Sequence, residues 1–96
     1  MKYEIILSLE AAQIYKALGA RLKTEVREAI ELHLRYEPTK TSRSRIKRLR
    51  GLSRPQYRLR VGEMRIYYDV SSSTVEVLAI VEKSKSGEWL EKAGEP

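Results

Sequence analysis

The stretch from Tyr57 to Val70, "YRLRVGEMRIYYDV", decides the fold. Apolar and polar residues alternate on both sides of Gly62-Glu63, and the alternating runs are rich in aromatic and β-branched residues. This pattern predicts two antiparallel strands, Tyr57–Val61 and Met64–Val70, that form a β-hairpin. A two-residue loop that begins with glycine suits a type II′ turn, which fixes how the two strands pair.

The predicted pairing separates the side chains of the hairpin into two faces, because successive side chains of a strand point to opposite sides. One face is apolar and is expected to pack on helices: Leu59, Val61, Met64, Ile66 and Tyr68. The other, here called the arginine face, consists of Arg58, Arg60, Arg65 and Tyr67. Arg60 and Arg65 lie directly opposite each other, and facing like charges cost about 0.2–1 kcal/mol. Bound phosphate would reverse that cost, because guanidinium groups match phosphate oxygens bidentately.

Tyr67 adds an aromatic ring on which a nucleobase can stack. The alternation therefore predicts an anion-binding face. The competing interpretation is an exposed strand on which the repulsion is merely tolerated.

The residues before the hairpin predict one strand and two helices. Lys2–Leu7 has the composition of a strand, and Ser8 is a suitable N-cap for the helix that follows. Apolar residues at helical spacing predict helices at about Ala11–Leu18 and Ala20–Tyr36, and Pro38 ends the second one.

Three further segments complete the expected order of elements. Ile46–Leu49 reads as a short strand or a turn, and Val75–Val81 as an interior strand because it is almost continuously apolar. A short helix is expected at Glu88–Lys92. The order β-α-α-β-β-β predicts a single α+β domain over residues 1–96. In it, a helical hairpin covers one face of an antiparallel sheet and the other face stays open.

Positive charge is concentrated in one segment. The chain carries a net charge of +6, yet Lys40–Arg65 alone holds ten Lys or Arg and one acid. Segregation of this kind favours a nucleic-acid or ribosome partner, although a solvated basic loop remains the alternative. Within this segment "RSRIKRLRGLSR" suits a non-specific grip on RNA phosphates through Arg43, Arg45, Lys47, Arg48, Arg50 and Arg54.

The composition excludes several classes of site. There is no cysteine, so the chain has no disulfide and no thiolate, which suits a reducing cytoplasm. The first ten residues are too short and too charged for a signal peptide or a membrane span, so a cytoplasmic protein without membrane contact is expected. The single histidine, His33, lies within a predicted helix, and no acidic or histidine cluster has metal-ligand spacing. We therefore expect neither a metal nor another cofactor.

The sequence resembles a known family. The order of elements, "LRG" at Leu49–Gly51 and above all the 57–70 hairpin resemble the RelE/ParE superfamily of bacterial and archaeal toxins. These are the toxin halves of type II toxin–antitoxin pairs. RelE-like members cut mRNA in the ribosomal A site, whereas ParE-like members poison DNA gyrase on the same fold. The resemblance therefore implies a RelE-like fold and a cognate antitoxin, but the fold alone leaves the activity open.

The RelE resemblance also implies roles for individual residues. Arg58 and Arg60 correspond to basic residues that contact the scissile phosphate region, and Arg65 corresponds to the arginine that stabilises the transition state. The segment after the last strand, "EKSKSGEWL", departs from the family pattern. A further arginine is expected near Ser84, so its place falls to Lys83 or Lys85.

The C-terminal aromatic or histidine position of the family falls near Leu90, beside Trp89. Trp89 can stack on a base but cannot transfer a proton. A lysine or Tyr67 is then left for proton transfer.

Three functions stay open at the level of sequence. The first is a ribosome-dependent mRNA endonuclease that inhibits translation, with the ribosome and mRNA as partners. The second is a ParE-like inhibitor of DNA gyrase that cuts no nucleic acid. The third is a degenerate toxin that retains only antitoxin binding, in which the basic segment neutralises an acidic antitoxin.

Overall fold

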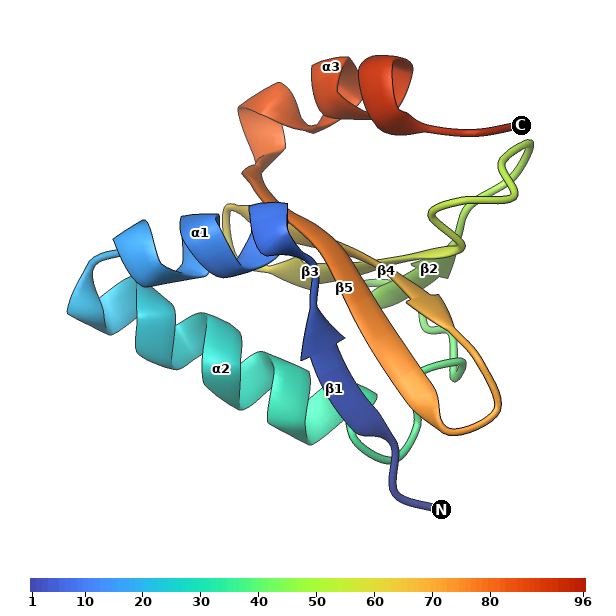
Figure 1. Cartoon of the computed structure of the whole chain (residues 1–96), viewed down its shortest axis with the longest axis horizontal. Coiled ribbons are helices and arrows are strands. Elements are labelled where there is room, and N and C mark those ends of the chain that lie inside the picture. The colour runs from blue at the N-terminus through green and yellow to red at the C-terminus, as the bar shows by residue number, and fades with distance from the viewer.

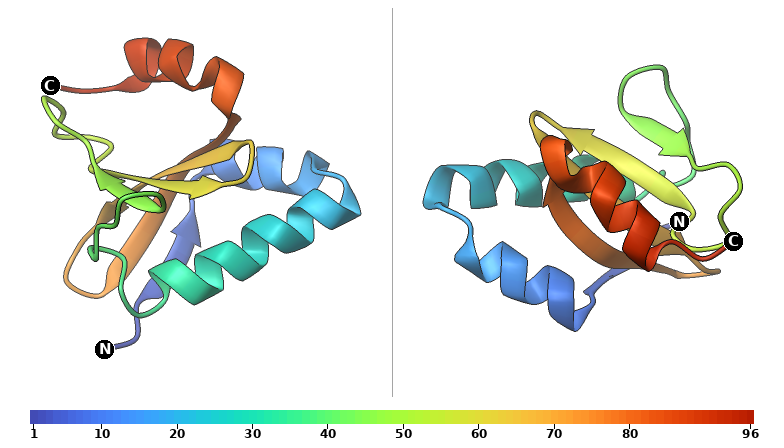
Figure 2. Two further views of the ribbon diagram at one scale, coloured as in Figure 1. Left: turned by 180° about the vertical axis from the view of Figure 1, so that it is seen from behind. Right: turned by 90° about the horizontal axis from the view of Figure 1, so that it is seen from above.

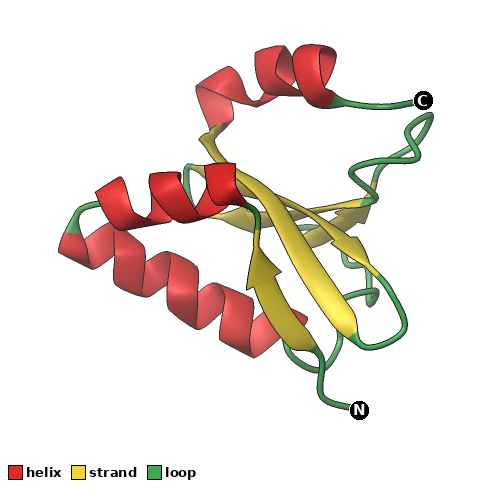
Figure 3. Cartoon of the chain, viewed as in Figure 1, coloured by secondary structure: helices red, strands yellow, loops and turns green.

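The computed structural model describes residues 1–96 and forms one five-stranded sheet flanked by helices (Figure 1). The elements in chain order are β1 (Glu4–Leu7), α1 (Leu9–Ala17), α2 (Ala20–Leu34), β2 (Ile46–Arg48), β3 (Tyr57–Val61), β4 (Met64–Val70), β5 (Thr74–Glu82) and α3 (Lys83–Ala93). The strand order is β1-β5-β4-β3-β2; β1 runs parallel to β5 and every other pair is antiparallel (Figure 3). The predicted α+β class is confirmed.

The hairpin of β3 and β4 has the register predicted from its two-residue turn. Arg60 lies opposite Arg65, and Leu59 lies opposite Ile66. Gly62 adopts a φ of +57°, a left-handed conformation that strains other residues, and no residue other than glycine has a positive φ. A positive φ at the first turn residue alone is the pattern of a type II′ turn.

The helical hairpin of α1 and α2 covers the apolar face of the sheet and encloses the core. Ser8 caps α1 as predicted: its Oγ accepts from the backbone N–H of Ala11 at 3.1 Å and donates to the carbonyl of Leu78 at 2.9 Å. Those two bonds tie the start of α1 to β5. The buried cluster comprises Ala11, Val26, Ile30, Leu34, Ile46, Leu59, Val61, Met64, Ile66, Tyr68, Val75, Val77 and Ile80.

The second face of the sheet differs from the expectation, because it is not open. The helix expected at Glu88–Lys92 extends over Lys83–Ala93 as α3, and it lies across the face opposite the helical hairpin (Figure 2). Trp89 supplies the ring that covers Tyr67 on that face. The segment Glu88–Lys92, from which the helix was predicted, is only five residues long and is too short to indicate where a helix begins and ends.

Smaller differences concern the ends of elements. The uncertain segment at Ile46–Leu49 is a three-residue edge strand, β2. The strand predicted from Lys2 begins at Glu4, and the helix predicted to reach Tyr36 ends at Leu34. None of the helices combines the length and the apolar character that crossing a membrane requires.

Candidate nucleic-acid interface

The register of the sheet places the basic side chains in adjoining rows. In one row, Lys47 on β2 pairs with Arg58 on β3, which pairs with Tyr67 on β4. In the next row, Arg60 pairs with Arg65. Cross-strand partners share one face of a sheet, so the structure confirms that the four members of the arginine face lie together and adds Lys47 to them.

Arg58 has the least satisfied side chain of this group. Its residue is half-buried, and its Nε is fully buried without any hydrogen-bond partner. Burial lowers the pKa of the Arg58 guanidinium, and the nearby positive charges of Arg65 and Arg60 lower that pKa further. A buried donor without an acceptor costs about 1–3 kcal/mol, and more when it is charged. An oxyanion at this place would supply both the acceptor and the opposite charge.

No carboxylate of the chain compensates the arginine face. Arg58, Arg60 and Arg65 take part in none of the seven ion pairs of the structure. Arg60 is exposed, but Arg58 is half-buried and Arg65 is buried, and charges that are taken out of water are usually paired in proteins. The arginine face therefore carries positive charge that no carboxylate of the chain neutralises.

Arg65 is more buried than is expected for a strand residue on an open face of a sheet. Its side chain is only 6% exposed, and its Nη1 donates to the carbonyls of Gly62 at 2.8 Å and Met64 at 2.9 Å. The backbone N–H of Lys83 donates to the carbonyl of Glu63 at 2.7 Å. Arg65 and the start of α3 are thus held by the same hairpin turn, and Arg65 braces that turn in addition to carrying charge.

The expectation that Tyr67 presents an open ring is corrected by the structure. Tyr67 is 2% exposed, and its ring stacks on Trp89 with centroids 5.0 Å apart and planes 17° from parallel. The indole Nε1 of Trp89 donates to Glu10 Oε2 at 2.9 Å, which links α3 to α1. The two aromatic residues assigned to base stacking therefore stack on each other, because alternation predicts the face of a strand but not what a distant helix places on it.

Most of the segment Arg43–Arg54, here called the basic segment, lies exposed along the edge of the sheet. Arg43, Arg45, Lys47, Arg48 and Arg50 are all exposed and take part in none of the ion pairs. Arg45 Nη1 donates to the carbonyl of Arg60 at 3.3 Å, and the guanidinium of Arg48 lies 5.1 Å from the ring centroid of Tyr57. Both contacts leave the positive charge of the side chain without an anionic partner.

Arg54 differs from the rest of the basic segment. It forms ion pairs with Asp69 at 3.6 Å and with Glu76 at 3.4 Å, so its charge is compensated within the protein. Burial raises the pKa of Asp69, against the lowering effects of the Gln56 backbone N–H and of Arg54. The sequence did not predict that Asp69 and Glu76 pair with Arg54. The alternation along β4 does place Asp69 on the same side of the sheet as Tyr67.

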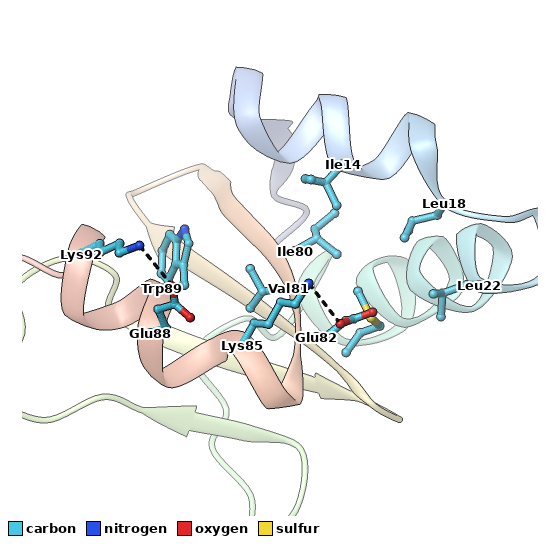
Figure 4. Close-up of a pocket in the computed structure, with 11 residues that line it drawn as sticks. Ile14, Leu18, Leu22, Ile80, Val81, Glu82, Lys85, Glu88, Trp89 and Lys92 are labelled. Carbon is cyan, nitrogen blue, oxygen red and sulfur yellow. Dashed lines mark hydrogen bonds and ion pairs between the residues drawn. The ribbon is translucent and has the colours of Figure 1, made fainter.

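Lys83 and Lys85 lie in the first turn of α3, at the end of the sheet where the hairpin turns. Both are exposed, and Lys85 Nζ lies 3.8 Å from Glu82. Beside them a groove of about 440 Å³ separates the helical hairpin from α3 (Figure 4). Figure 4 shows its apolar wall and its charged rim; the lining residues include Ile14, Leu18, Leu22, Ile80, Lys85 and Trp89.

His33 lies outside this arrangement. It is half-buried on α2, which packs against the apolar face of the sheet. Burial lowers the pKa of the imidazole, and the positive charge of Arg45 lowers it further. No three His, Asp or Glu side chains of the chain come together as a metal-binding group.

The comparison with known proteins identifies the fold. No family model and no curated protein sequence matches the chain. Among solved structures, the archaeal RelE–RelB complex from Pyrococcus horikoshii OT3 matches with a TM-score of 0.71 and 20% identity, over 88% of this chain and 99% of that one. The RelBE2 toxin–antitoxin complex from Mycobacterium tuberculosis matches with a TM-score of 0.70 and 22% identity, over 85% and 99% of the two chains.

A third structure, the YoeB/ParE toxin from Agrobacterium tumefaciens, matches with a TM-score of 0.66 and 20% identity, over 82% of this chain and 96% of that one. The chain therefore has the fold of the RelE/ParE-type toxins. The structural neighbours are RelE, YoeB and ParE toxins of toxin–antitoxin systems. At these identities the likeness establishes the fold, and activity has to be argued from the site.

Proposed function

We propose that this protein is the toxin of a type II toxin–antitoxin pair and that it cleaves mRNA on the ribosome without a metal ion. The observation that carries the proposal is the arginine face, where three guanidinium groups lack any carboxylate partner and the Nε of Arg58 is buried without an acceptor. The toxin fold agrees with this proposal.

The chemistry we propose is attack of a ribose 2′-hydroxyl on the adjacent phosphorus. The hydroxyl gives up its proton to a base, its oxygen bonds to phosphorus, and the bond from phosphorus to the 5′-oxygen of the next nucleotide breaks. The products are a 2′,3′-cyclic phosphate and a 5′-hydroxyl, whose oxygen takes up a proton from an acid. Negative charge accumulates on the phosphoryl oxygens in the transition state. Arg58, Arg60 and Arg65 would stabilise that charge from fixed positions, which is the form of catalysis in which preorganised donors contribute most.

The arginine face has few groups that can transfer a proton. Arginine stays protonated and is a poor base, and Tyr67 is covered by Trp89. Lys83 and Lys85 are the remaining groups near the hairpin turn that can exchange a proton. We therefore assign most of the rate enhancement to charge stabilisation and to alignment of the mRNA by the ribosome.

The exposed basic residues from Arg43 to Arg50 would hold the RNA backbone beside the arginine face. Contacts of this kind neutralise phosphates and make binding depend steeply on salt. The same surface suits an acidic protein, and an antitoxin is the partner in the neighbouring RelE–RelB and RelBE2 complexes. We propose a cognate antitoxin as the second partner of this chain, and a cytoplasmic site of action for both.

The proposal is tested by mapping the 5′ ends of cellular mRNA after controlled expression of the protein. New ends within translated codons are expected for the wild type, and they should disappear in the Arg58→Met variant. Arg27→Met is the matched control, because Arg27 is an exposed arginine of α2 outside every ion pair. Intact messages during growth arrest would refute the endonuclease.

The gyrase inhibitor is the second candidate, and the shortage of proton-transfer groups on the arginine face favours it. A ParE-like protein needs only to bind, so it requires no acid or base. In this case plasmid supercoiling would fall in cells expressing the protein while mRNA stays intact. Normal supercoiling in arrested cells would exclude it, and absence of toxicity would leave a degenerate toxin that retains antitoxin binding.

A further inference from the structure

A polar pocket of about 240 Å³ lies between the last turn of α2 and the loop that leads to β2. This loop runs from the end of α2 to the edge of the sheet, where β2 lies (Figure 2). We therefore call the pocket the edge pocket. Its volume is below the roughly 300–1,000 Å³ of sites for drug-sized ligands, and it suits one phosphate with part of its sugar. Its polar lining comprises His33, Glu37, Lys40, Thr41, Ser42 and Arg45.

The lining of the edge pocket contains hydrogen-bond donors that the protein leaves free. Neither the His33 ring nor the Thr41 hydroxyl takes part in any side-chain hydrogen bond of the structure. Ser42 Oγ accepts from the backbone N–H of Arg45 at 3.0 Å and from that of Ile46 at 3.3 Å, so its own proton can be donated to a ligand. Imidazole, hydroxyl and guanidinium donors around one pocket match the several oxygens of a phosphate group.

The edge pocket is also positively charged. Glu37, Lys40 and Arg45 are the charged groups that share it with His33. Lys40 lies 3.5 Å from Glu37, but both side chains are largely exposed, so solvent weakens their attraction. Arg45 takes part in no ion pair, and its charge adds to the effect of burial in lowering the pKa of the His33 imidazole. An anion between the two side chains would offset this repulsion.

The walls of the edge pocket are held in place by the core and by the loop itself. The hydroxyl of Tyr68 on β4 donates to the carbonyl of Pro38 at 2.6 Å, and this buried bond ties the start of the loop to the sheet. At the other end, the backbone N–H of Ser42 donates to the carbonyl of Ile46 at 2.9 Å. Donors that are already fixed lose little conformational freedom when a ligand binds.

Arg45 connects the edge pocket to the arginine face. Its carbonyl accepts from the backbone N–H of Arg60 at 2.9 Å, and its Nη1 donates to the Arg60 carbonyl at 3.3 Å. The register of β2, β3 and β4 therefore continues the row of Arg60 and Arg65 to Arg45. Because every nucleotide of a strand carries a phosphate, a strand that lies on this row brings successive phosphates to the arginine face and to Arg45.

We propose that the edge pocket binds a phosphate group, and that an RNA strand on the arginine face continues past the start of β2 so that one of its backbone phosphates occupies the pocket. This inference rests on the proposed function for the strand but not for the phosphate. His33, Ser42 and Arg45 donate to the phosphate oxygens. The bound phosphate holds the strand in register on the arginine face, and its affinity increases when His33 is protonated.

An NMR titration of His33 tests the pocket directly, because His33 is the only histidine of the chain. The imidazole pKa of the wild-type protein is measured alone, with saturating hexauridylate and with inorganic phosphate. All samples have the same ionic strength, set with sodium chloride, because salt alone screens the repulsion from Arg45. We expect the RNA to raise the pKa by at least about one unit, which corresponds to tenfold tighter binding to the protonated form. Inorganic phosphate should raise it as well.

A carboxylate placed in the pocket separates direct contact from the general effect of nearby negative charge. Thr41→Glu introduces it in the lining, whereas Thr39→Glu introduces the same charge in the same loop outside the lining. Both threonines are exposed, so neither change disturbs the core. We expect fluorescein-labelled hexauridylate to bind Thr41→Glu at least about tenfold more weakly than the wild type, and Thr39→Glu within about twofold. Equal losses in the two variants would overturn the proposal.

The ligands separate this inference from the proposed function. If the RNA binds but does not raise the pKa of His33, the strand does not enter the edge pocket, and the inference fails while the proposed function stands. If the RNA does not bind but inorganic phosphate raises that pKa, the nucleic-acid function fails and the phosphate site stands. A larger rise with a hexaglutamate peptide than with the RNA would assign the pocket to an acidic protein and overturn the inference, as would no rise with any ligand.

Discussion

The two faces of the sheet are built on different principles, although alternate residues of the same strands supply both. The face toward α1 and α2 is a closed apolar cluster in which Leu59, Ile66 and Tyr68 are fully buried. The face toward α3 carries Arg58 and Arg65, which no acid compensates. The first face stabilises the fold, whereas the second retains unpaired charge that an external ligand can use.

The helices that cover the two faces differ in the same way. Helix α2 buries Val26, Ile30 and Leu34 against the sheet, while α3 buries none of its residues. It is attached by one aromatic stack and by the backbone bridge between Arg54 and Glu95 that follows it. The buried apolar cluster and the uncompensated charge therefore lie on opposite faces of the same sheet. A substitution is expected to affect one or the other according to the face on which its side chain lies.

The largest expected effect comes from truncating the apolar face. Leu59→Ala removes a fully buried side chain and should lower the free energy of unfolding by about 2–5 kcal/mol. Arg60→Ala, the next residue on β3, removes an exposed side chain of the arginine face and should change it by less than about 0.5 kcal/mol. Urea titration measures both. Comparable losses in the two variants would break the distinction between the faces.

An intermediate effect is expected at the stack that closes the arginine face. Trp89→Ala removes the aromatic pair with Tyr67, which contributes about 0.5–1.5 kcal/mol beyond the apolar area that it buries, together with the hydrogen bond to Glu10. Amide exchange should speed up in α3 and stay unchanged in β4, while Trp89→Phe should largely preserve both. A loss of stability as large as that of Leu59→Ala would instead make α3 an integral part of the core.

The smallest expected effect is a pH dependence of the free energy of unfolding that arises from His33 on α2. The folded-state pKa of His33 lies below its usual value of 6.5, because burial and Arg45 disfavour the imidazolium. The unfolded chain then binds the proton more readily, so stability is full above pH 6.5 and falls as the pH drops toward the folded-state pKa. Thermal melts across this window should show the decline in the wild type and a shallower one in His33→Gln. A folded-state titration of His33 by NMR above 6.5 would contradict the sign.

Much of the fold follows from the sequence because its determinants are local. Two alternating runs around Gly62-Glu63 fix the register of β3 and β4, and the helical spacing with Ser8 predicts the α1–α2 hairpin. The composition of the arginine face follows from the same alternation. These predictions need only neighbouring residues and the period of each element.

What the sequence did not predict depends on contacts between distant residues. The burial of Tyr67 by Trp89, the ion pairs of Arg54 and the bridge from Arg54 to Glu95 join residues between 15 and 41 positions apart, and none of these contacts has a local sequence pattern. The depth of Arg65 likewise depends on the position of α3. These unpredicted contacts determine whether the arginine face is open.

Arg58→Met tests our proposal that the arginine face is retained for an external anion at the expense of stability. Methionine fills similar space while removing the buried donor that lacks a partner and its repulsion with Arg65. We expect an unchanged or higher melting temperature together with at least about a tenfold loss of affinity for a short single-stranded RNA, measured on the same preparation. A variant that is less stable yet binds the RNA as tightly as the wild type would contradict it.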